Sequence, residues 1–394
     1  MKLGLPLSLV LLTLVAFVGK ISAASPAHES QFPFKLYQQI AKEQSKRNVL
    51  VSPLSISTAL SMTYSGAAGD TKKALAATLG YADASDAAVS SEAKKLMDSL
   101  QNPGGGTKLQ IANGLFGEKK VQFKQTFLAS SKQNFNAGLK SLDFQSPGAV
   151  NEINSWVSEK THGKIPTIID QLNPNAVLFL INAIYFKGSW EHKFEKSRTK
   201  PHDFVTAGGA RKKVQLMNMD RSDFQYFEND QFQAVNLSYA DKRLHLYVFL
   251  PKQGKTIDAF DASFTQKNWD AWKSQFHKSE GHLGLPRFKV EDKLELEKPL
   301  TALGLGIAFD QKKAEFPGLA NFNLFITRVI HKTFMEVNEE GTEAAAVTGI
   351  EMAPTAAVMN PKPPFKMIVD RPFFVALHDG QTDKILFAGH ITQP

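Results

Sequence analysis

The segment Glu336–Asn360, EVNEEGTEAAAVTGIEMAPTAAVMN, decides how the rest of the chain is interpreted. From Thr342 onward small or apolar residues fall on even positions, whereas the charged residues Glu343 and Glu351 fall on odd ones. This period of two is typical of a strand with one buried face. The segment is also rich in alanine and glycine and contains Pro354, as an exposed loop would. The pattern indicates a segment that can serve as a loop and as a strand.

A helix is the alternative for this segment, because its alanine run has high helix propensity. Thr348, Gly349 and Ile350 oppose a helix through β-branching and a flexible backbone. No apolar stripe at helical spacing runs through the segment. We therefore favour the loop that can become a strand.

Two motifs resemble those of a known family. Residues 339–346, EEGTEAAA, resemble the reactive-loop hinge of inhibitory serpins, and residues 370–375, DRPFFV, resemble the C-terminal signature of that family. The similarity extends from about Phe32 to Pro394. It implies a single-domain α+β fold with a large central β-sheet, two further sheets, about eight to nine helices and an exposed reactive loop at about residues 340–361. It assigns the loop hinge to Glu339, Gly341, Thr342, Glu343, Ala344, Ala345 and Ala346.

Hydrophobic periodicity along the chain supports α+β architecture, because helix and strand patterns are segregated. Helices are predicted at Phe32 to Glu43, Ser52 to Gly66, Asp70 to Gly80, Asp86 to Leu100, Gln125 to Phe135, Ala149 to Lys160, Thr265 to Phe276 and Leu294 to Leu303. Strands are predicted at Asn48 to Val51, Leu109 to Phe116, Val177 to Ile181, within Phe204 to Pro251, and at Leu283 to Val290, Leu324 to Asn338, Phe365 to Val369, Pro372 to Leu377 and Ile385 to Ile391. Ser52 and Asp70 are expected to cap helices, and Gly80 to end one.

The composition favours one large domain and gives no sign of an enzyme. The 394 residues are 43% hydrophobic, which suffices for a large core, and no low-complexity tract or internal repeat divides the chain. Cysteine is absent, which excludes thiol catalysis and cysteine-ligated metal. There is no nucleophile elbow, phosphate-binding loop, zinc-protease motif or calcium loop. We therefore expect no enzymatic activity, no metal and no cofactor.

The first 23 residues have the pattern of a signal peptide. Lys2 precedes the apolar run from Leu3 to Val18, and small residues close the segment. A membrane anchor is the alternative, but the run is shorter than the roughly 20 residues that a spanning helix needs. We expect residues 1–23 to be a signal peptide, residues 24–394 to form the domain, and the mature protein to be secreted and extracellular.

The formal net charge is +8, and the basic residues are scattered in short runs. A solvated surface is the preferred interpretation, and weak polyanion binding is the alternative. The helix predicted at Asp86 to Leu100 carries only Lys94 and Lys95 as basic residues, so it lacks the dense basic cluster of heparin-activated serpins. We expect equal inhibition rates with and without heparin, no nucleic-acid or membrane partner, and a monomer.

The resemblance implies an inhibitor that acts on serine proteases as a suicide substrate, and the predicted signal peptide implies that it is secreted. A protease would cleave the loop and form an acyl-enzyme, and the freed loop would enter the main sheet as a new strand. Family spacing from Gly341 implies cleavage at Thr355-Ala356, or up to three residues further along, where small residues favour elastase-like or subtilisin-like targets. Met352 leaves a chymotrypsin-like target open. The alternative is a non-inhibitory serpin with a carrier, storage or chaperone role, which the small hinge residues disfavour.

The resemblance implies further site residues. It assigns a sheet-opening cluster to Ser52, Ser55, Asn182 and His331, for which ordinary satisfaction of buried polar groups is the alternative. It assigns the insertion point to Trp190, Arg287 and Glu339. Trp190 could equally be a plain core aromatic, and an Arg287–Glu339 pair at the surface would contribute little stability. Asn236 opens an Asn-Leu-Ser sequon and is a glycosylation candidate that a strand could hide.

Overall fold

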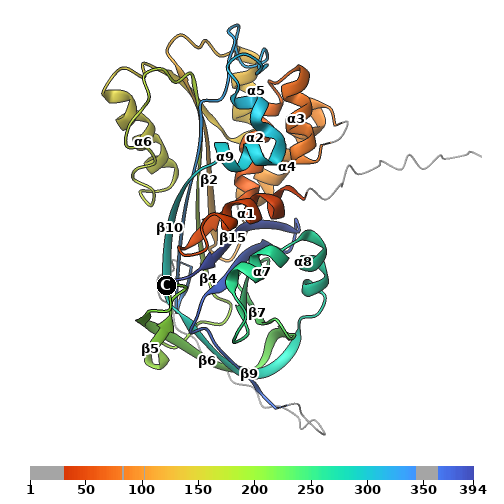
Figure 1. Ribbon diagram of the computed structural model, residues 1–394, viewed down its shortest axis with the longest axis vertical. Helices are drawn as coiled ribbons and strands as arrows, with labels where there is room; N and C mark the ends of the chain where they lie inside the picture. The colour runs from red at the N-terminus through yellow and green to blue at the C-terminus, as the bar shows by residue number, and fades with distance from the viewer. Residues whose placement is uncertain (1–30, 82–83, 102, 343–362) are drawn as a thin grey trace, which may run out of the picture.

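The computed structural model describes residues 31–81, 84–101, 103–342 and 363–394. Figure 1 shows an elongated molecule, in which a long sheet runs down the longest axis, helices gather around its upper end and further strands form its lower end. The predicted signal peptide and the predicted reactive loop from Glu343 to residue 361 lie outside the described residues.

Six strands in the order β10-β11-β12-β4-β2-β3 form the main sheet. They are β2 (Lys108–Glu118), β3 (Gly138–Leu142), β4 (Leu178–Ser189), β10 (Phe288–Glu295), β11 (Arg328–Asn338) and β12 (Gly341–Thr342). Every residue of β4 from Leu178 to Phe186 is buried, as expected for a central strand covered on both faces. In β10 buried residues alternate with exposed lysine and glutamate, which protects this edge strand from pairing with other chains.

The other nine described strands form one hydrogen-bonded set. They are β1 (Val49–Val51), β5 (Lys200–Val205), β6 (Arg211–Glu228), β7 (Phe232–Ser238), β8 (Leu244–Pro251), β9 (His277–Pro286), β13 (Phe365–Ile368), β14 (Phe373–Asp379) and β15 (Lys384–Ile391). The resemblance implied two further sheets, and β6 is the reason that they join here. Its 18 residues pair with β5 before a register shift between Arg221 and Phe224, and with β7 after it.

The described residues contain nine α-helices. They are α1 (Phe32–Lys42), α2 (Pro53–Tyr64), α3 (Gly69–Leu79), α4 (Asp86–Gln101), α5 (Gln125–Phe135), α6 (Gly148–Lys160), α7 (Ile257–Ser263), α8 (Gln266–Lys273) and α9 (Glu297–Leu300). The predicted α+β fold is therefore confirmed. None of these helices combines the length and the apolar character that crossing a bilayer requires.

Two helix signals were assigned correctly and one was not. The Ser52 hydroxyl accepts a hydrogen bond from the Ser55 amide at 3.2 Å and caps α2, as predicted. Gly80, at φ 78°, ends α3, also as predicted. Asp70 was predicted to cap α3, but the helix begins one residue earlier, at Gly69. Asp70 therefore lies in the first turn, where it pairs with Lys73.

The region after Leu283 differs from the predictions. The single strand predicted there is two strands, β9 and β10, separated by Arg287, because β9 pairs with β6 and β10 pairs with β11 of the main sheet. The helix predicted from Leu294 is wrong at its start. The buried positions Val290, Asp292 and Leu294 continue the two-residue alternation, so β10 extends to Glu295. Helical structure begins only at Glu297, with the short α9 and a π-helical segment at Thr301–Leu305 directly after it.

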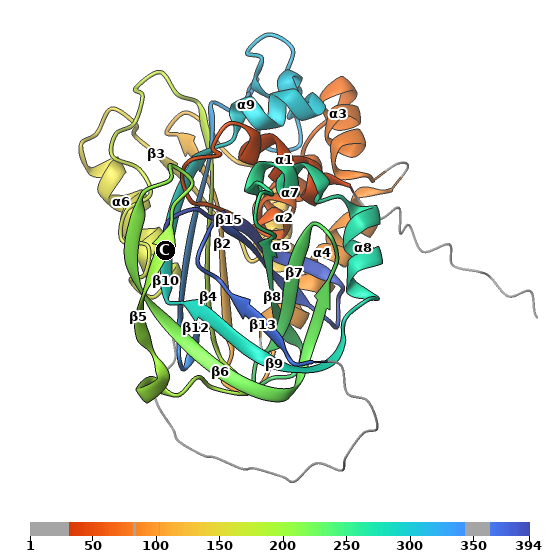
Figure 2. The same ribbon diagram turned by 60° about the horizontal axis from the view of Figure 1, so that its bottom comes forward.

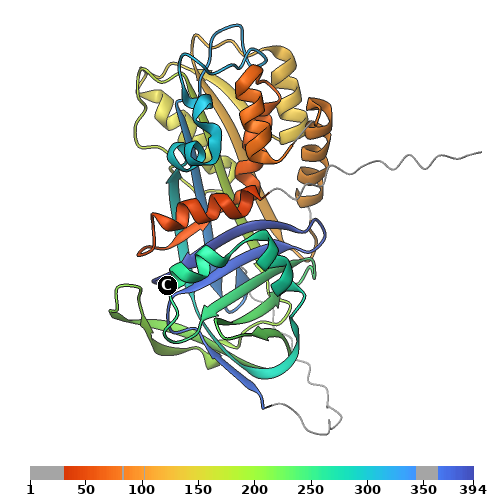
Figure 3. The ribbon, with the colours of Figure 1, turned by 45° about the vertical axis from the view of Figure 1, so that its right-hand side comes forward.

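Helices cover both faces of the main sheet. Figure 1 shows α6 on one side of the strands, with α1 to α5 on the other. The Trp156 ring of α6 lies over two glycines of the sheet, because a Cβ at Gly114 or Gly138 would stand only 2.8 or 2.6 Å from that ring. In Figure 3 the short helices α7 and α8, in teal, pack on the second set of strands.

Candidate functional site

Gly341 and Thr342 belong to the start of the predicted loop, and they form β12 between the two central strands of the main sheet. The chain leaves β11, turns at Glu339 and Glu340, and returns so that Thr342 pairs with Val337 of β11 and with Gly188 of β4. Figure 2 shows β12 at this end of the sheet, beside β4. Further along, β4 and β11 pair directly with each other as parallel strands. The start of the loop therefore lies inside a sheet that is closed beyond it.

Only glycine fits at Gly341. Its φ is 146°, in the region that favours glycine, and a Cβ there would lie 2.1 Å from the Gly188 carbonyl oxygen. A side chain at this position would force β12 away from β4.

Thr342 is held by an aromatic pair. Its side chain is fully buried, and its hydroxyl lies 2.6 Å from the Tyr239 hydroxyl. Burial raises the pKa of Tyr239, so its hydroxyl stays protonated and remains a hydrogen-bonding group. The Tyr239 ring stacks on Trp190 with centroids 4.5 Å apart, and the indole Nε1 of Trp190 donates to the Asn338 carbonyl at 2.9 Å. Trp190 is thus more than a core aromatic, because it fixes the turn that leads into β12.

Glu339 is anchored by Arg287 and Thr199. The Arg287 Nε lies 2.8 Å from each carboxylate oxygen of Glu339, and the Thr199 hydroxyl donates to Oε1 at 2.5 Å. Burial alone would raise the pKa of Glu339, but the hydrogen bonds from Arg287 and Thr199 outweigh it and hold that pKa below its usual value. A surface pair was predicted, yet the Glu339 side chain is only 2% exposed and Arg287 is 45% exposed. The pair is therefore half-buried, with its acidic partner inside the protein.

The four residues of the predicted sheet-opening cluster lie together where β4 and β11 pair. His331 and Asn182 are opposite each other in the register, and the His331 Nδ1 lies 2.5 Å from the Asn182 Oδ1. The Asn182 amide donates to the Ser55 Oγ at 2.5 Å and to the Asn113 Oδ1 at 2.7 Å. The Ser52 backbone amide donates to the His331 Nε2 at 3.0 Å. The cluster therefore ties α2 to both central strands.

His331 is neutral in this network. The Ser52 amide donates to Nε2, so the ring proton is on Nδ1 and faces the Asn182 oxygen. His331 is fully buried, and this burial lowers its pKa to about 3. Protonation would place a charge without a counter-ion between the central strands.

We expect His331 to make the protein acid-sensitive. Between pH 6.5 and 3 the unfolded chain binds a proton at this residue and the folded chain does not, so the free energy of unfolding falls as pH falls. The slope from one proton is about 1.4 kcal/mol per pH unit. Urea unfolding from pH 7 to 4 should show this slope in the difference between the wild type and His331→Gln. Identical pH profiles of the two proteins would contradict the assignment.

Sequence reasoning missed three members of these networks. Tyr239, Thr199 and Asn113 contact Thr342, Glu339 and Asn182 respectively. Tyr239 follows a strand with alternating polarity, and this pattern marks it as an inward residue without revealing its partner.

The remaining predicted residues lie elsewhere. Asn236 is half-buried in β7, opposite Tyr247 of β8. The reactive bond Thr355-Ala356 and the hinge residues Glu343, Ala344, Ala345 and Ala346 lie outside the described residues. Over the described part of the chain, no group of three or more potential metal ligands comes together.

Comparison with known proteins agrees with this architecture. The model of the serpin family, described as serine protease inhibitors, matches residues 27–394, and the chain belongs to that family. Serpin B6 of Macaca fascicularis is 33% identical over 371 residues, which are 92% of this chain and 97% of that protein. The leukocyte elastase inhibitor of Xenopus tropicalis is 34% identical over 376 residues, covering 93% and 98% of the two chains. The crystal structure of native protease nexin-1 with heparin has a TM-score of 0.83 and 27% identity, and the match covers 93% of this chain and 97% of that one.

Proposed function

We propose that this serpin inhibits serine proteases as a suicide substrate, whose cleaved reactive loop enters the main sheet and traps the acyl-enzyme. The observation that carries the proposal is β12, which already lies between β4 and β11 and pairs antiparallel with both of them. The protein itself has no catalytic activity in this scheme. A covalent complex with a protease, seen on a denaturing gel, tests it.

The register of β12 supports entry of the loop. If pairing continued past Thr342, each even-numbered residue would stand between an inward residue of β4 and one of β11. Ala344 would fall between Phe186 and Met335. Residues at these positions are small or apolar, so the strand could enter without overpacking a core that is already filled.

The same register gives the sheet-opening cluster a role. Thr348 would reach the level of Asn182 and His331, so entry of the loop would break their direct hydrogen bond. The parallel pairs from Arg328–Phe179 to Phe334–Tyr185 would open, and an antiparallel strand would pair on each side. About ten new backbone hydrogen bonds at a net 0.5–1.5 kcal/mol each would supply about 5–15 kcal/mol.

Loop entry would move the attached protease far from its docking position. About 15 residues at roughly 3.3 Å each span on the order of 50 Å. The protease would be drawn along the main sheet over most of that distance, with its catalytic serine still esterified to the loop. Distortion of the protease under this pull is how the complex would resist hydrolysis.

We propose elastase-like or subtilisin-like proteases as the targets and Thr355-Ala356 as the reactive bond. The small residues around this bond support the proposal, as does the elastase inhibitor among the relatives. Mass spectrometry after reaction with elastase should show a released C-terminal fragment that begins at Ala356. Thr355→Arg should shift inhibition toward trypsin-like proteases, which need a basic residue there. A fragment that begins more than three residues from Ala356 would overturn the assignment.

We also propose that the protein is secreted as a monomer, after removal of residues 1–23. The apolar run that follows Lys2 supports secretion, and N-terminal sequencing of protein from a secreting host tests the removal of residues 1–23. Polyanion binding is proposed to be weak and without effect on the inhibition rate, since α4 carries only Lys94 and Lys95. A glycan at Asn236 would have to be added before β7 pairs with β8.

A further inference from the structure

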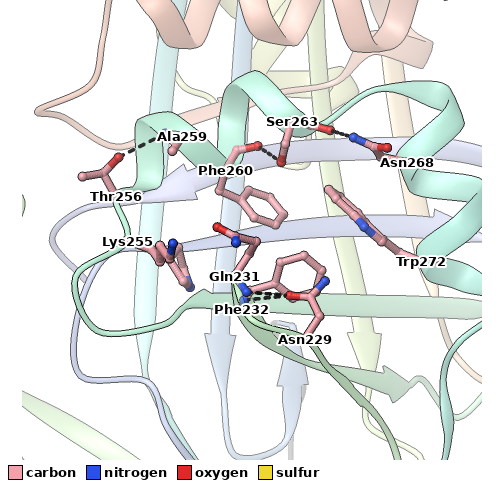
Figure 4. A pocket seen from close by; sticks show the side chains of 11 residues that line it. Asn229, Gln231, Phe232, Lys255, Thr256, Ala259, Phe260, Ser263, Asn268 and Trp272 are labelled. Atoms are coloured by element: carbon pink, nitrogen blue, oxygen red, sulfur yellow. Dashed lines mark hydrogen bonds between the residues drawn. The ribbon is translucent and has the colours of Figure 1, made fainter.

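A pocket of about 250 Å³ lies between α7, α8 and the turn that joins β6 to β7 (Figure 4). It is on the second set of strands, away from β12 and the sheet-opening cluster. Neither the proposed inhibitory mechanism nor the residues assigned to it use this pocket.

Three aromatic rings form the apolar wall of the pocket. Phe232 of β7 contacts Phe260 of α7 and Trp272 of α8, with ring centroids 5.5 and 5.0 Å apart. Phe260 also stacks on Trp272 at 5.4 Å. Phe232 and Phe260 are buried, while Trp272 is half-buried, and Figure 4 shows the three side chains facing a common space. A flat apolar group could stack on ring faces and pack against ring edges there.

Most polar groups around the pocket already serve the fold. The Thr256 hydroxyl caps α7 by accepting from the Ala259 amide, and Ser263 donates to the Phe260 carbonyl. The Asn229 Oδ1 accepts from two backbone amides of the β6–β7 turn, which leaves its Nδ2 group as a donor.

Lys255 gives the pocket its charge. It is exposed, it is the only charged residue among those that line the pocket, and no carboxylate lines it. Within the described residues, the Lys255 ammonium takes part in no ion pair, whereas the nearby Lys252 pairs with Glu228 at 3.1 Å. The only charged group that the lining offers a ligand is therefore a cation, and it lies beside an aromatic wall.

We propose that this pocket binds a small aromatic carboxylate, with its ring against Phe232, Phe260 and Trp272 and its carboxylate at Lys255. The size is suitable, because an apolar cavity of about 150 Å³ accepts benzene. Drug-sized ligands need about 300 Å³ or more, so one ring with a short acidic chain fits best. This binding is independent of the inhibitory mechanism.

The test is a titration with 3-phenylpropanoate, followed by tryptophan fluorescence and by the shift in melting temperature. We expect saturable binding with a Kd on the order of 1 mM. The neutral 3-phenylpropanamide should bind at least fivefold more weakly. Lys255→Ala should weaken binding of the carboxylate by a similar factor, while Lys252→Ala, which alters a neighbouring lysine outside the pocket, should leave it unchanged.

A further variant tests whether the ligand binds next to Trp272. Trp272→Phe should abolish the fluorescence change and keep the melting shift, because phenylalanine preserves the apolar wall. No saturation by 20 mM ligand, equal affinity for acid and amide, or an unaltered Kd in Lys255→Ala would each overturn the proposal.

Discussion

Replacement of Thr342 by arginine is expected to turn this serpin from an inhibitor into a substrate. The Thr342 side chain is fully buried beside Tyr239, between β4 and β11. Arginine there would either expel β12 from the sheet or bury a cation without a counter-ion, which costs several kcal/mol. Every 1.4 kcal/mol added to the barrier slows insertion about tenfold. The acyl-enzyme is then hydrolysed before the loop has inserted.

The measurement for Thr342→Arg is the stoichiometry of inhibition. It should rise from near 1 to on the order of 10 or more, with cleaved protein accumulating on gels. Thr342→Val is the matched control, because it keeps the shape and loses only the hydroxyl that meets Tyr239. It should remain an inhibitor, with a stoichiometry within about twofold of the wild type. An arginine variant that inhibits as efficiently as the valine variant would refute loop entry through β12.

Asn182→Ala is expected to destabilise the native protein strongly. Its side chain is hydrogen-bonded to His331, Ser55 and Asn113, all of them buried. Removing it leaves several buried polar groups without a partner, at about 1–3 kcal/mol each. Partial relaxation reduces the total to about 3–5 kcal/mol. The melting temperature should fall by about 5 °C or more.

Asn175→Ala is the control for Asn182→Ala. Asn175 lies just before the same strand, but its side chain is exposed. Its replacement should change the free energy of unfolding by no more than about 0.5 kcal/mol. Equal melting temperatures of the two variants would show that the cluster does not hold β4 and β11 together.

Much of the fold could be predicted from local patterns. The continuous apolar run at Val177 to Ile181 identified the central strand, and the predicted bounds of the helix at Gln125 to Phe135 agree with α5. These predictions succeed because burial imposes a period on the sequence. The short α7 was not predicted, because seven residues carry too little periodicity.

The site was predictable only in part. The motif EEGTEAAA predicts the reactive loop, most of which lies outside the described residues. The resemblance named His331 and Asn182, which the structure brings together. The entry of Thr342 into the sheet and its contact with Tyr239, about a hundred residues earlier in the chain, could not be predicted. Pairing partners far apart in sequence leave no local signal. The burial of Glu339 was missed for the same reason, since Thr199 and Arg287 come from other elements.

One measurement tests the central claim most directly. The mature protein is mixed with a pancreatic-type elastase, and separately with subtilisin, and the products are run on a denaturing gel. A band at the summed mass of inhibitor and protease, stable in denaturant, is the predicted result and would demonstrate a trapped acyl-enzyme. The account would be contradicted if the gels for both enzymes showed only shortened serpin and free, active protease.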